Sequence, residues 1–302
     1  MDSRILDTHF HWWDTSVLRY PWLVNEALSD GVFFVARGSL PTRYSPLDYG
    51  ADTAPTSVLP FVHIEAACLA ADSVAETRWV ERLVSQHSVD IRLVAGVDLS
   101  SPQLEGVLEQ HRIASGGLAG VRHIVTWHPT PRFSFVERDL LTDESWRRGL
   151  ALVARQGLTF DLQIYAAQAS NAVAVARLNP DLRLVVEHAG LPLEWDLIGL
   201  RAWRTAMVAL AAAPNIAMKI GGLAMVKRDW KQSEVVPRIR ELVEIFGPSR
   251  CMLSTNFPLE RASHTIHQLI AAWEQALEPF SPTERAAVRA TAAEEWYGGP
   301  RS

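Results

Sequence analysis

The sequence has few cysteines and no long apolar run, and these two absences narrow the class of protein. Among 302 residues only Cys68 and Cys251 are cysteines, so we expect two unpaired thiols in a reducing cytoplasm rather than a disulfide framework. No run of about 18 apolar residues occurs, and the first residues lack the charged and apolar regions of a secretion signal. The sequence therefore predicts neither export nor membrane insertion.

An excess of positive charge is also missing. The formal net charge is -5 and the isoelectric point is about 6.1, with no basic stripe or polybasic segment. We therefore expect neither nucleic acid nor an anionic membrane surface as a partner. A small-molecule substrate is expected instead. No Gly/Ser-rich linker divides the chain, so we predict one domain over residues 1–302, and a homo-oligomer is left open.

What the chain does contain is an alternation of short β-branched runs with longer amphipathic segments. Alternating strands and helices favour parallel pairing, and eight such units predict a (β/α)8 barrel of the α/β class. A doubly wound sheet is the alternative, but it usually has a glycine-rich turn after its first strand, where this chain has His-Phe-His. The predicted strands are residues 4–7, 58–64, 91–97, 118–125, 158–164, 182–187, 216–220 and 251–254.

Two segments exceed this repeat. Residues 12–57 have little helical periodicity and several prolines, so we expect a long first loop over the barrel mouth. Residues 282–296 follow a Ser-Pro helix start and predict an extra C-terminal helix packed outside the barrel.

Polar side chains cluster where the predicted strands end, which is where barrel enzymes place their chemistry. Alternation puts His9 and His11 on one face, together with Ile5 and Asp7, and His188 follows the sixth strand. Converging imidazoles can hold a divalent cation or polarise a carbonyl oxygen directly. Structural histidines with satisfied hydrogen bonds are the alternative.

Five stretches carry a family resemblance: LDTHFHWWD, LAGVRHIV, LRLVVEHAGLP, NIAMKIGGL and CMLSTNFPLE. In this order the chain resembles the amidohydrolase superfamily. Within it, the chain is similar to the sugar-acid lactonase branch that includes L-fuconolactonase, L-rhamnonolactonase and 2-pyrone-4,6-dicarboxylate lactonase. The resemblance implies a (β/α)8 barrel that hydrolyses a cyclic ester, with His9, His11 and His188 matching the family's active-site histidines.

The chain departs from this family at its eighth strand, where the usual general-base aspartate is replaced by Asn256. An amide cannot take a proton at neutral pH, although it can hydrogen-bond a water or a carbonyl. We therefore expect a catalytic set of His9, His11, His188, Asn256 and Glu65, with Glu65 the leading candidate for the base. Two other functions remain open: a metal-dependent non-oxidative decarboxylase of a small aromatic acid, and a barrel that binds its ligand without turnover.

The resemblance leaves the metal open, because the branch also contains enzymes that work without one. If a single divalent cation is bound, zinc on His9, His11 and His188 is the expectation. Arg122 and His123 end the fourth strand and are expected to bind substrate, with a structural ion pair as the alternative for Arg122. The sequence has 11 tryptophans. Those that follow strand ends are expected to form an apolar wall of the site, namely Trp12, Trp13, Trp22 and Trp127.

Overall fold

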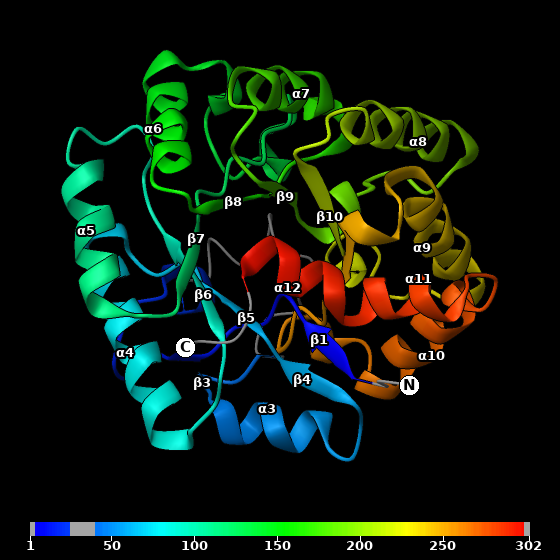
Figure 1. The fold of residues 1–302 in the computed structure, drawn as a ribbon, viewed down its shortest axis with the longest axis horizontal. Coiled ribbons are helices and arrows are strands. Elements are labelled where there is room, and N and C mark those ends of the chain that lie inside the picture. The colour runs from blue at the N-terminus through cyan, green and yellow to red at the C-terminus, as the bar shows by residue number, and fades with distance from the viewer. Residues whose placement is uncertain (1–3, 25–39, 299–302) are drawn as a thin grey trace.

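The computed structural model describes residues 4–24 and 40–298, and a curled parallel sheet forms its centre (Figure 1). Seven strands follow one another in the order β11-β10-β9-β8-β7-β6-β5, and all their pairings are parallel. Their bounds are β5 Val62–Ile64, β6 Arg92–Gly96, β7 Leu118–Arg122, β8 Thr159–Leu162, β9 Leu184–Val186, β10 Ile216–Ile220 and β11 Cys251–Leu253.

The N-terminal segment closes this sheet into an α/β barrel. Strand β1 (Ile5–Asp7) pairs in parallel with β4 (Val58–Pro60). Beyond β1, Phe10 forms isolated parallel bridges to His63 on one side and Phe257 on the other. Every predicted strand range thus contains an observed strand, and the first is joined to both edges of the seven-stranded sheet.

The predicted second strand is divided at Pro60. Before this residue the chain pairs with β1, and after it β5 pairs with β6. Proline has no N–H to donate to a ladder, so it suits the point where pairing changes. The next amide, Phe61 N, donates to Asp7 O on the first strand, while Phe61 O accepts from Arg92 N on the third.

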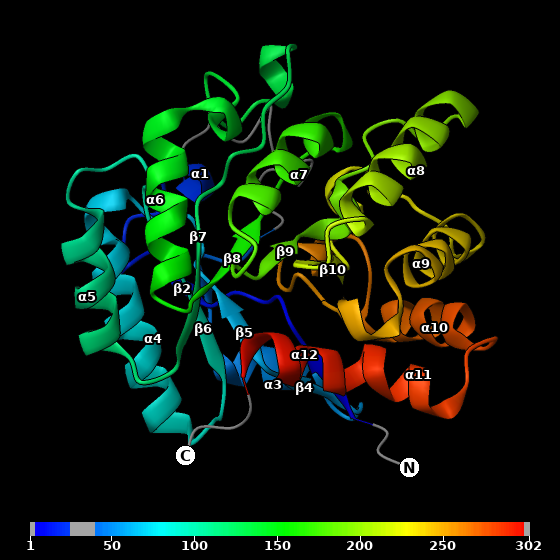
Figure 2. The same ribbon diagram turned by 45° about the horizontal axis from the view of Figure 1, so that its top comes forward.

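Helices cover the outside of the sheet (Figure 2). Several start at capping side chains: Asp143 accepts from Ser145 N and Trp146 N, and Asp196 accepts from Ile198 N and Gly199 N. The outer helices are α4 Ser73–His87, α5 Leu104–Ala114, α6 Glu144–Arg155, α7 Ala169–Leu178, α8 Leu197–Ala211, α9 Gln232–Phe246 and α10 Ile266–Leu277.

The C-terminal helices lie across one end of the barrel and not against its side (Figure 1). Helices α11 (Pro282–Ala286) and α12 (Ala292–Tyr297) are joined by a π-helical turn. Arg183, just before β9, donates to the carbonyls of Glu295 and Trp296, so α12 covers the N-terminal strand ends. The apolar face of α12 packs against barrel side chains such as Met252. The predicted packing outside the barrel is therefore wrong, and the helix closes the N-terminal end of the barrel.

The first loop is partly described. It contains β2 (Trp13–Asp14), α1 (Pro21–Val24), β3 (Arg43–Tyr44) and α3 (Pro46–Thr53), with β2 and β3 antiparallel. The expectation that residues 12–57 cover the barrel mouth falls partly on residues 25–39, which lie outside the described residues.

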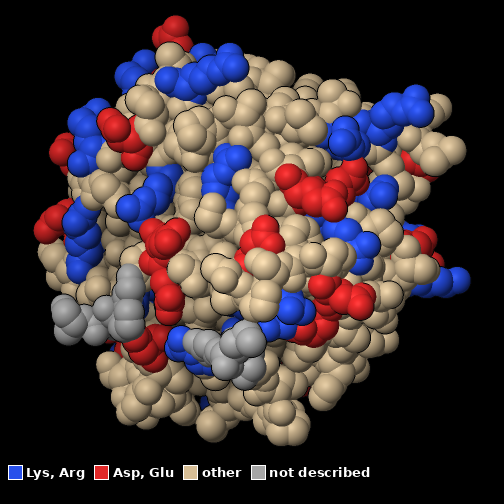
Figure 3. Space-filling model, turned by 45° about the vertical axis from the view of Figure 1, so that its right-hand side comes forward, with Lys and Arg blue, Asp and Glu red and all other residues tan. Residues whose placement is uncertain are grey.

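The described surface carries mixed charge. On the face in Figure 3, basic and acidic side chains are interspersed. None of the described helices is long and apolar enough to cross a membrane.

Candidate active site

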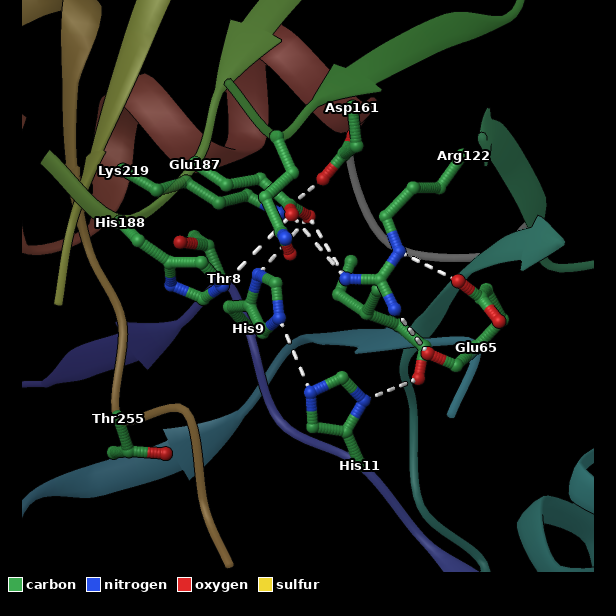
Figure 4. Close-up of polar contacts among 12 residues, drawn as sticks. Thr8, His9, His11, Glu65, Arg122, Asp161, Glu187, His188, Lys219 and Thr255 are labelled. Carbon is green, nitrogen blue, oxygen red and sulfur yellow. Dashed lines mark hydrogen bonds and ion pairs between the residues drawn. The ribbon is translucent and has the colours of Figure 1, made fainter. Parts of the chain in front are cut away.

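His9 and His11 converge beyond the end of β1 (Figure 4). Their Nε2 atoms lie 3.2 Å apart and both side chains are buried. The predicted convergence is therefore present, but Ile5 and Asp7 do not share this face. Ile5 belongs to the large core between sheet and helices, whereas Leu6 packs in the barrel interior.

Asp7 explains why simple alternation fails. Its carboxylate accepts from Tyr49 Oη on α3, from Thr255 N and Oγ1, and from His9 N. These bonds end the regular ladder at Asp7, so the alternation does not run unbroken through Thr8 to His9. Burial raises the pKa of Asp7 to about 6, against the lowering effect of these four donors.

The outer nitrogens of the two imidazoles are held in place. His11 Nδ1 lies 2.9 Å from Ile64 O, so it carries the proton that this contact requires. His9 Nδ1 lies 3.2 Å from Glu187 Oε1, an ion-pair distance without the geometry of a hydrogen bond. A proton on each Nδ1 would leave the two Nε2 lone pairs facing each other across 3.2 Å.

These imidazoles are neutral. Burial lowers the pKa of both His9 and His11 well below the usual range, and it outweighs the opposing effect of Glu187. Burial also lowers the pKa of His188 to about 4. All three rings can therefore accept a hydrogen bond or ligate a cation at neutral pH.

Glu187 joins the histidines to Arg122, and our sequence-derived site did not include it. Its carboxylate contacts His9, lies 3.2 Å from Arg122 Nη1 and 3.8 Å from His188 Nε2. Burial alone would raise the pKa of Glu187, but Arg122 and His9 hold it well below its usual range. Its position directly before His188 at a strand end was the signal that could have identified it.

Arg122 and Glu65, both predicted site residues, form an ion pair with each other. Arg122 Nε donates to Glu65 Oε1 over 2.6 Å, and Arg122 Nη2 donates to Glu65 O. The second carboxylate oxygen, Oε2, accepts from Ala67 N. Arg122 is thus the structural ion pair that we named as an alternative, although it also lines the pocket. Both oxygens of Glu65 are engaged, which counts against Glu65 as a free base.

Asn256 and His188 present unpartnered polar atoms. Both side-chain atoms of Asn256 and the Nδ1 of His188 are buried without a hydrogen-bond partner among the described residues. Asn256 also has a positive φ of 54°, which asparagine tolerates better than most residues. An orphaned buried amide is costly unless a ligand or water satisfies it.

These groups line a narrow pocket at the C-terminal ends of the strands, with a cavity volume of about 20 Å³. This volume admits a water or one polar group of a small molecule. Polar and apolar walls alternate around it: His11, Trp22, Ala66, Ala67, Arg122, Ile124, Gln163, His188, Met225, Asn256 and Leu259.

The predicted aromatic wall reduces to one tryptophan. Trp22 lines the pocket and donates from Nε1 to Ala66 O. Trp12 and Trp13 are fully buried in the core, and half-buried Trp127 is not part of the pocket lining. His123 also lies outside this pocket and faces a neighbouring cavity.

The donor set fits a divalent cation. Two imidazole nitrogens bound to tetrahedral zinc lie about 3.3 Å apart, close to the 3.2 Å between the two Nε2 atoms. A carboxylate behind His9 and a carbonyl behind His11 are the usual outer partners of metal-bound imidazoles. A second set shares His9, because ligand atoms of His9, Glu187 and His188 lie within 4.8 Å of one another. Arg122 faces two carboxylates, so one negative charge is left for a cation to balance.

Fold and site together define an α/β-barrel enzyme with a histidine-rich centre. A model of the amidohydrolase family matches residues 6–299, and the chain belongs to that family. An uncharacterised protein of Sinorhizobium fredii, y4mH, is 30% identical over 291 residues, covering 95% of this chain and 96% of its own.

Two further relatives agree with the resemblance to the lactonase branch. An L-fucono-1,5-lactonase of Burkholderia multivorans is 26% identical over 319 residues, with 99% of this chain and 98% of the relative covered. The crystal structure of an amidohydrolase from the same species with bound zinc superposes with a TM-score of 0.81 at 22% identity, covering 99% of this chain and 100% of that chain. The latter likeness concerns the fold.

Proposed function

We propose that the protein is a hydrolase that opens a small lactone by attack of water on a histidine-polarised carbonyl. The observation that carries this proposal is the pair of neutral imidazole nitrogens, 3.2 Å apart, at a pocket that also holds the unpartnered amide of Asn256. The lactonase relative supports the same bond type.

In this proposal one divalent cation, zinc, would be held by His9 with either His11 or His188. Glu187 would be the outer partner of His9 in the first case and a further ligand in the second. Such a cation, when bound, polarises the carbonyl and makes a nearby water more acidic. Glu187 would also offset part of the charge of the bound cation. Its fully buried carboxylate lies 3.2 Å from His9 Nδ1 and 3.8 Å from His188 Nε2.

Asn256 takes the positioning part of the missing aspartate. Its Nδ2 can donate to the carbonyl oxygen, and its Oδ1 can accept from the attacking water, because neither atom has a partner in the described part of the chain. Glu65 remains a candidate base by type, but its oxygens are occupied by Arg122 and Ala67. The proton that the attacking water loses ends on the alkoxide oxygen released when the ring opens, so no carboxylate of the pocket has to retain it.

We favour a sugar-acid lactone over a pyrone dicarboxylate. Arg122 is the cationic residue among the described lining residues, and it is paired with Glu65 and Glu187. Its remaining N–H groups suit a hydroxyl or carbonyl oxygen of such a lactone. The similarity to L-fucono-1,5-lactonase over 99% of this chain supports the same substrate class.

The test measures hydrolysis of a panel of sugar-acid and pyrone lactones by zinc-supplemented protein. The acid that each opened lactone releases is the signal. We expect turnover of uncharged lactones, loss of at least about a hundredfold in kcat/KM for His188→Ala, and no change for the exposed His267→Ala on α10. The proposal is wrong if no lactone is opened, and carbon dioxide release from aromatic acids would favour the alternative.

A further inference from the structure

A second cavity adjoins the pocket, and the proposed reaction does not use it. It has a volume of about 360 Å³ and lies over the C-terminal ends of β5, β6 and β7. We call it the side cavity. It shares the walls formed by Ala67, Arg122 and Ile124 with the pocket. Its remaining lining comes from Glu65, Cys68, Ala70, Ser73, Gly96, Val97, Asp98, Ser101, Leu104, Val107 and His123.

His123 supplies a hydrogen-bond donor to this cavity. Its Nδ1 accepts from Leu99 N over 3.2 Å, so the neutral ring carries its proton on Nε2. Burial lowers the pKa of His123 despite the nearby Asp98, which keeps the ring neutral. Its Nε2 has no partner among the described residues, and the donor remains available to a ligand.

Asp98 supplies an acceptor beside it. Its Oδ1 accepts from Ser100 N and lies 3.8 Å from His123 Nδ1, which is too far for a hydrogen bond. Its side chain is 53% exposed, and Oδ2 has no partner among the described residues. Glu65, the other carboxylate of the side cavity, is already paired with Arg122.

A free donor next to a free acceptor matches hydroxyl groups, each of which donates and accepts. An ammonium group would use Asp98 and leave the His123 donor unpaired, and an anion would meet the charge of Asp98. The apolar part of the lining, which includes Val97, Leu104 and Val107, can pack against the C–H faces of a sugar ring.

We propose that the side cavity binds a second, polyhydroxylated unit attached to the lactone, so that a glycosylated lactone is preferred over a monocyclic one. The preference for a glycosylated lactone rests on the proposed function, whereas binding of the polyhydroxylated unit in the side cavity does not. The pocket, with about 20 Å³, would take the lactone carbonyl, and the adjoining side cavity, with about 360 Å³, has the room for the attached unit.

The activity experiment compares a monocyclic aldono-1,5-lactone with its 4-O- and 6-O-glucosyl derivatives. The wild-type protein should show a higher kcat/KM, by about tenfold, for at least one glucosyl derivative, with the gain mainly in KM. Ser101→Trp, which fills the side cavity, should remove this preference while turnover of the monocyclic lactone stays within about twofold. The matched control is Gln110→Trp, at an exposed position outside the cavity on α5, the helix that follows Ser101.

The binding experiment uses the corresponding glucosyl alditols, which contain no lactone to hydrolyse, and measures their affinity by calorimetry. Binding of the alditols by the wild-type protein supports the inference if the affinity falls about tenfold in His123→Ala and in Asp98→Asn. If such binding is found but no lactone is turned over, the proposed function fails and the inference about the side cavity stands. The inference is overturned if the alditols do not bind while monocyclic lactones are hydrolysed, or if Ser101→Trp lowers both activities equally.

Discussion

Gly222, after β10, packs directly against the imidazole of His188. A Cβ on Gly222 would lie 2.1 Å from His188 Nδ1 and 2.6 Å from its Cγ. The residue also has a φ of +66°, which favours glycine. The backbone after β10 therefore fixes where the ring of His188 can lie.

We predict that Gly222→Ala displaces His188 and lowers kcat by at least about tenfold. A shift of about 1 Å in a catalytic group is enough to lower the reaction rate strongly. Gly157→Ala is the matched control. Gly157 has a similar φ of +68° but no atom within 4 Å of the added Cβ. Equal activity losses in the two variants would show that backbone strain, and not the position of His188, is responsible.

Asn256→Asp tests whether the chain uses its amide. If the enzyme works with Asn256, the substitution introduces a fully buried carboxylate with no partner among the described residues, and we expect kcat/KM to fall by about tenfold or more. A gain in lactone hydrolysis would instead identify a barrel that has lost turnover. Lactone hydrolysis measured from pH 5 to 9 distinguishes the two.

Zinc content distinguishes the two possible ligand sets. If His9 and His11 hold the cation through Nε2, His11→Ala should lose zinc almost completely, whereas Glu187→Gln should weaken binding by about 10- to 100-fold, as outer-partner changes do. The alternative set of His9, Glu187 and His188 predicts retention in His11→Ala. Elemental analysis after dialysis against zinc of fixed concentration gives the answer, and chelation should abolish turnover in the first case.

Glu260 predicts a specific pH dependence of stability. Its Oε1 accepts from Ala224 N and Trp230 Nε1, its Oε2 is buried without a described partner, and burial raises its pKa from 4.5 to about 7. Because the pKa is higher in the folded state, its contribution is present below pH 4.5 and is lost as the pH rises to about 7.

Glu260→Gln keeps the acceptor and removes the charge. Between pH 4.5 and 7 the wild-type free energy of unfolding should therefore fall relative to this variant, by at most about 3 kcal/mol. Urea denaturation of both proteins at pH 4.5, 6, 7 and 8 tests this. A constant difference across the series would contradict the prediction.

Lys219 and Asp161 form a fully buried ion pair in the barrel interior, and Tyr297 Oη on α12 donates to the same carboxylate over 2.7 Å. Lys219→Met leaves Asp161 buried and unpaired, so we expect a loss of about 3–5 kcal/mol in unfolding free energy. Lys219→Met combined with Asp161→Leu removes both charges and should recover most of that loss. Additive losses in the double variant would mean that the pair is not coupled.

The sequence by itself determined the fold class and the main histidines. Alternating β-branched and amphipathic segments can bury their apolar faces together only in a parallel sheet covered by helices, so all eight predicted strand ranges contain observed strands. Strand-end position also selected His9, His11, His188 and Asn256 as candidate site residues, because the carboxyl ends of a barrel's strands meet on one face.

Only the tertiary structure decided how these residues are partnered. Arg122 and Glu65 are 57 positions apart, and neither local propensity nor periodicity shows that they neutralise each other. The tryptophans behave similarly. Trp12 packs against Phe10 and His63, and Trp13 packs against Trp22 and Tyr44, so both are buried. Of the four predicted tryptophans, Trp22 alone lines the pocket. Side-chain partners depend on which loops lie next to each other in the folded chain. Those contacts join residues far apart in the sequence, so local patterns do not predict them.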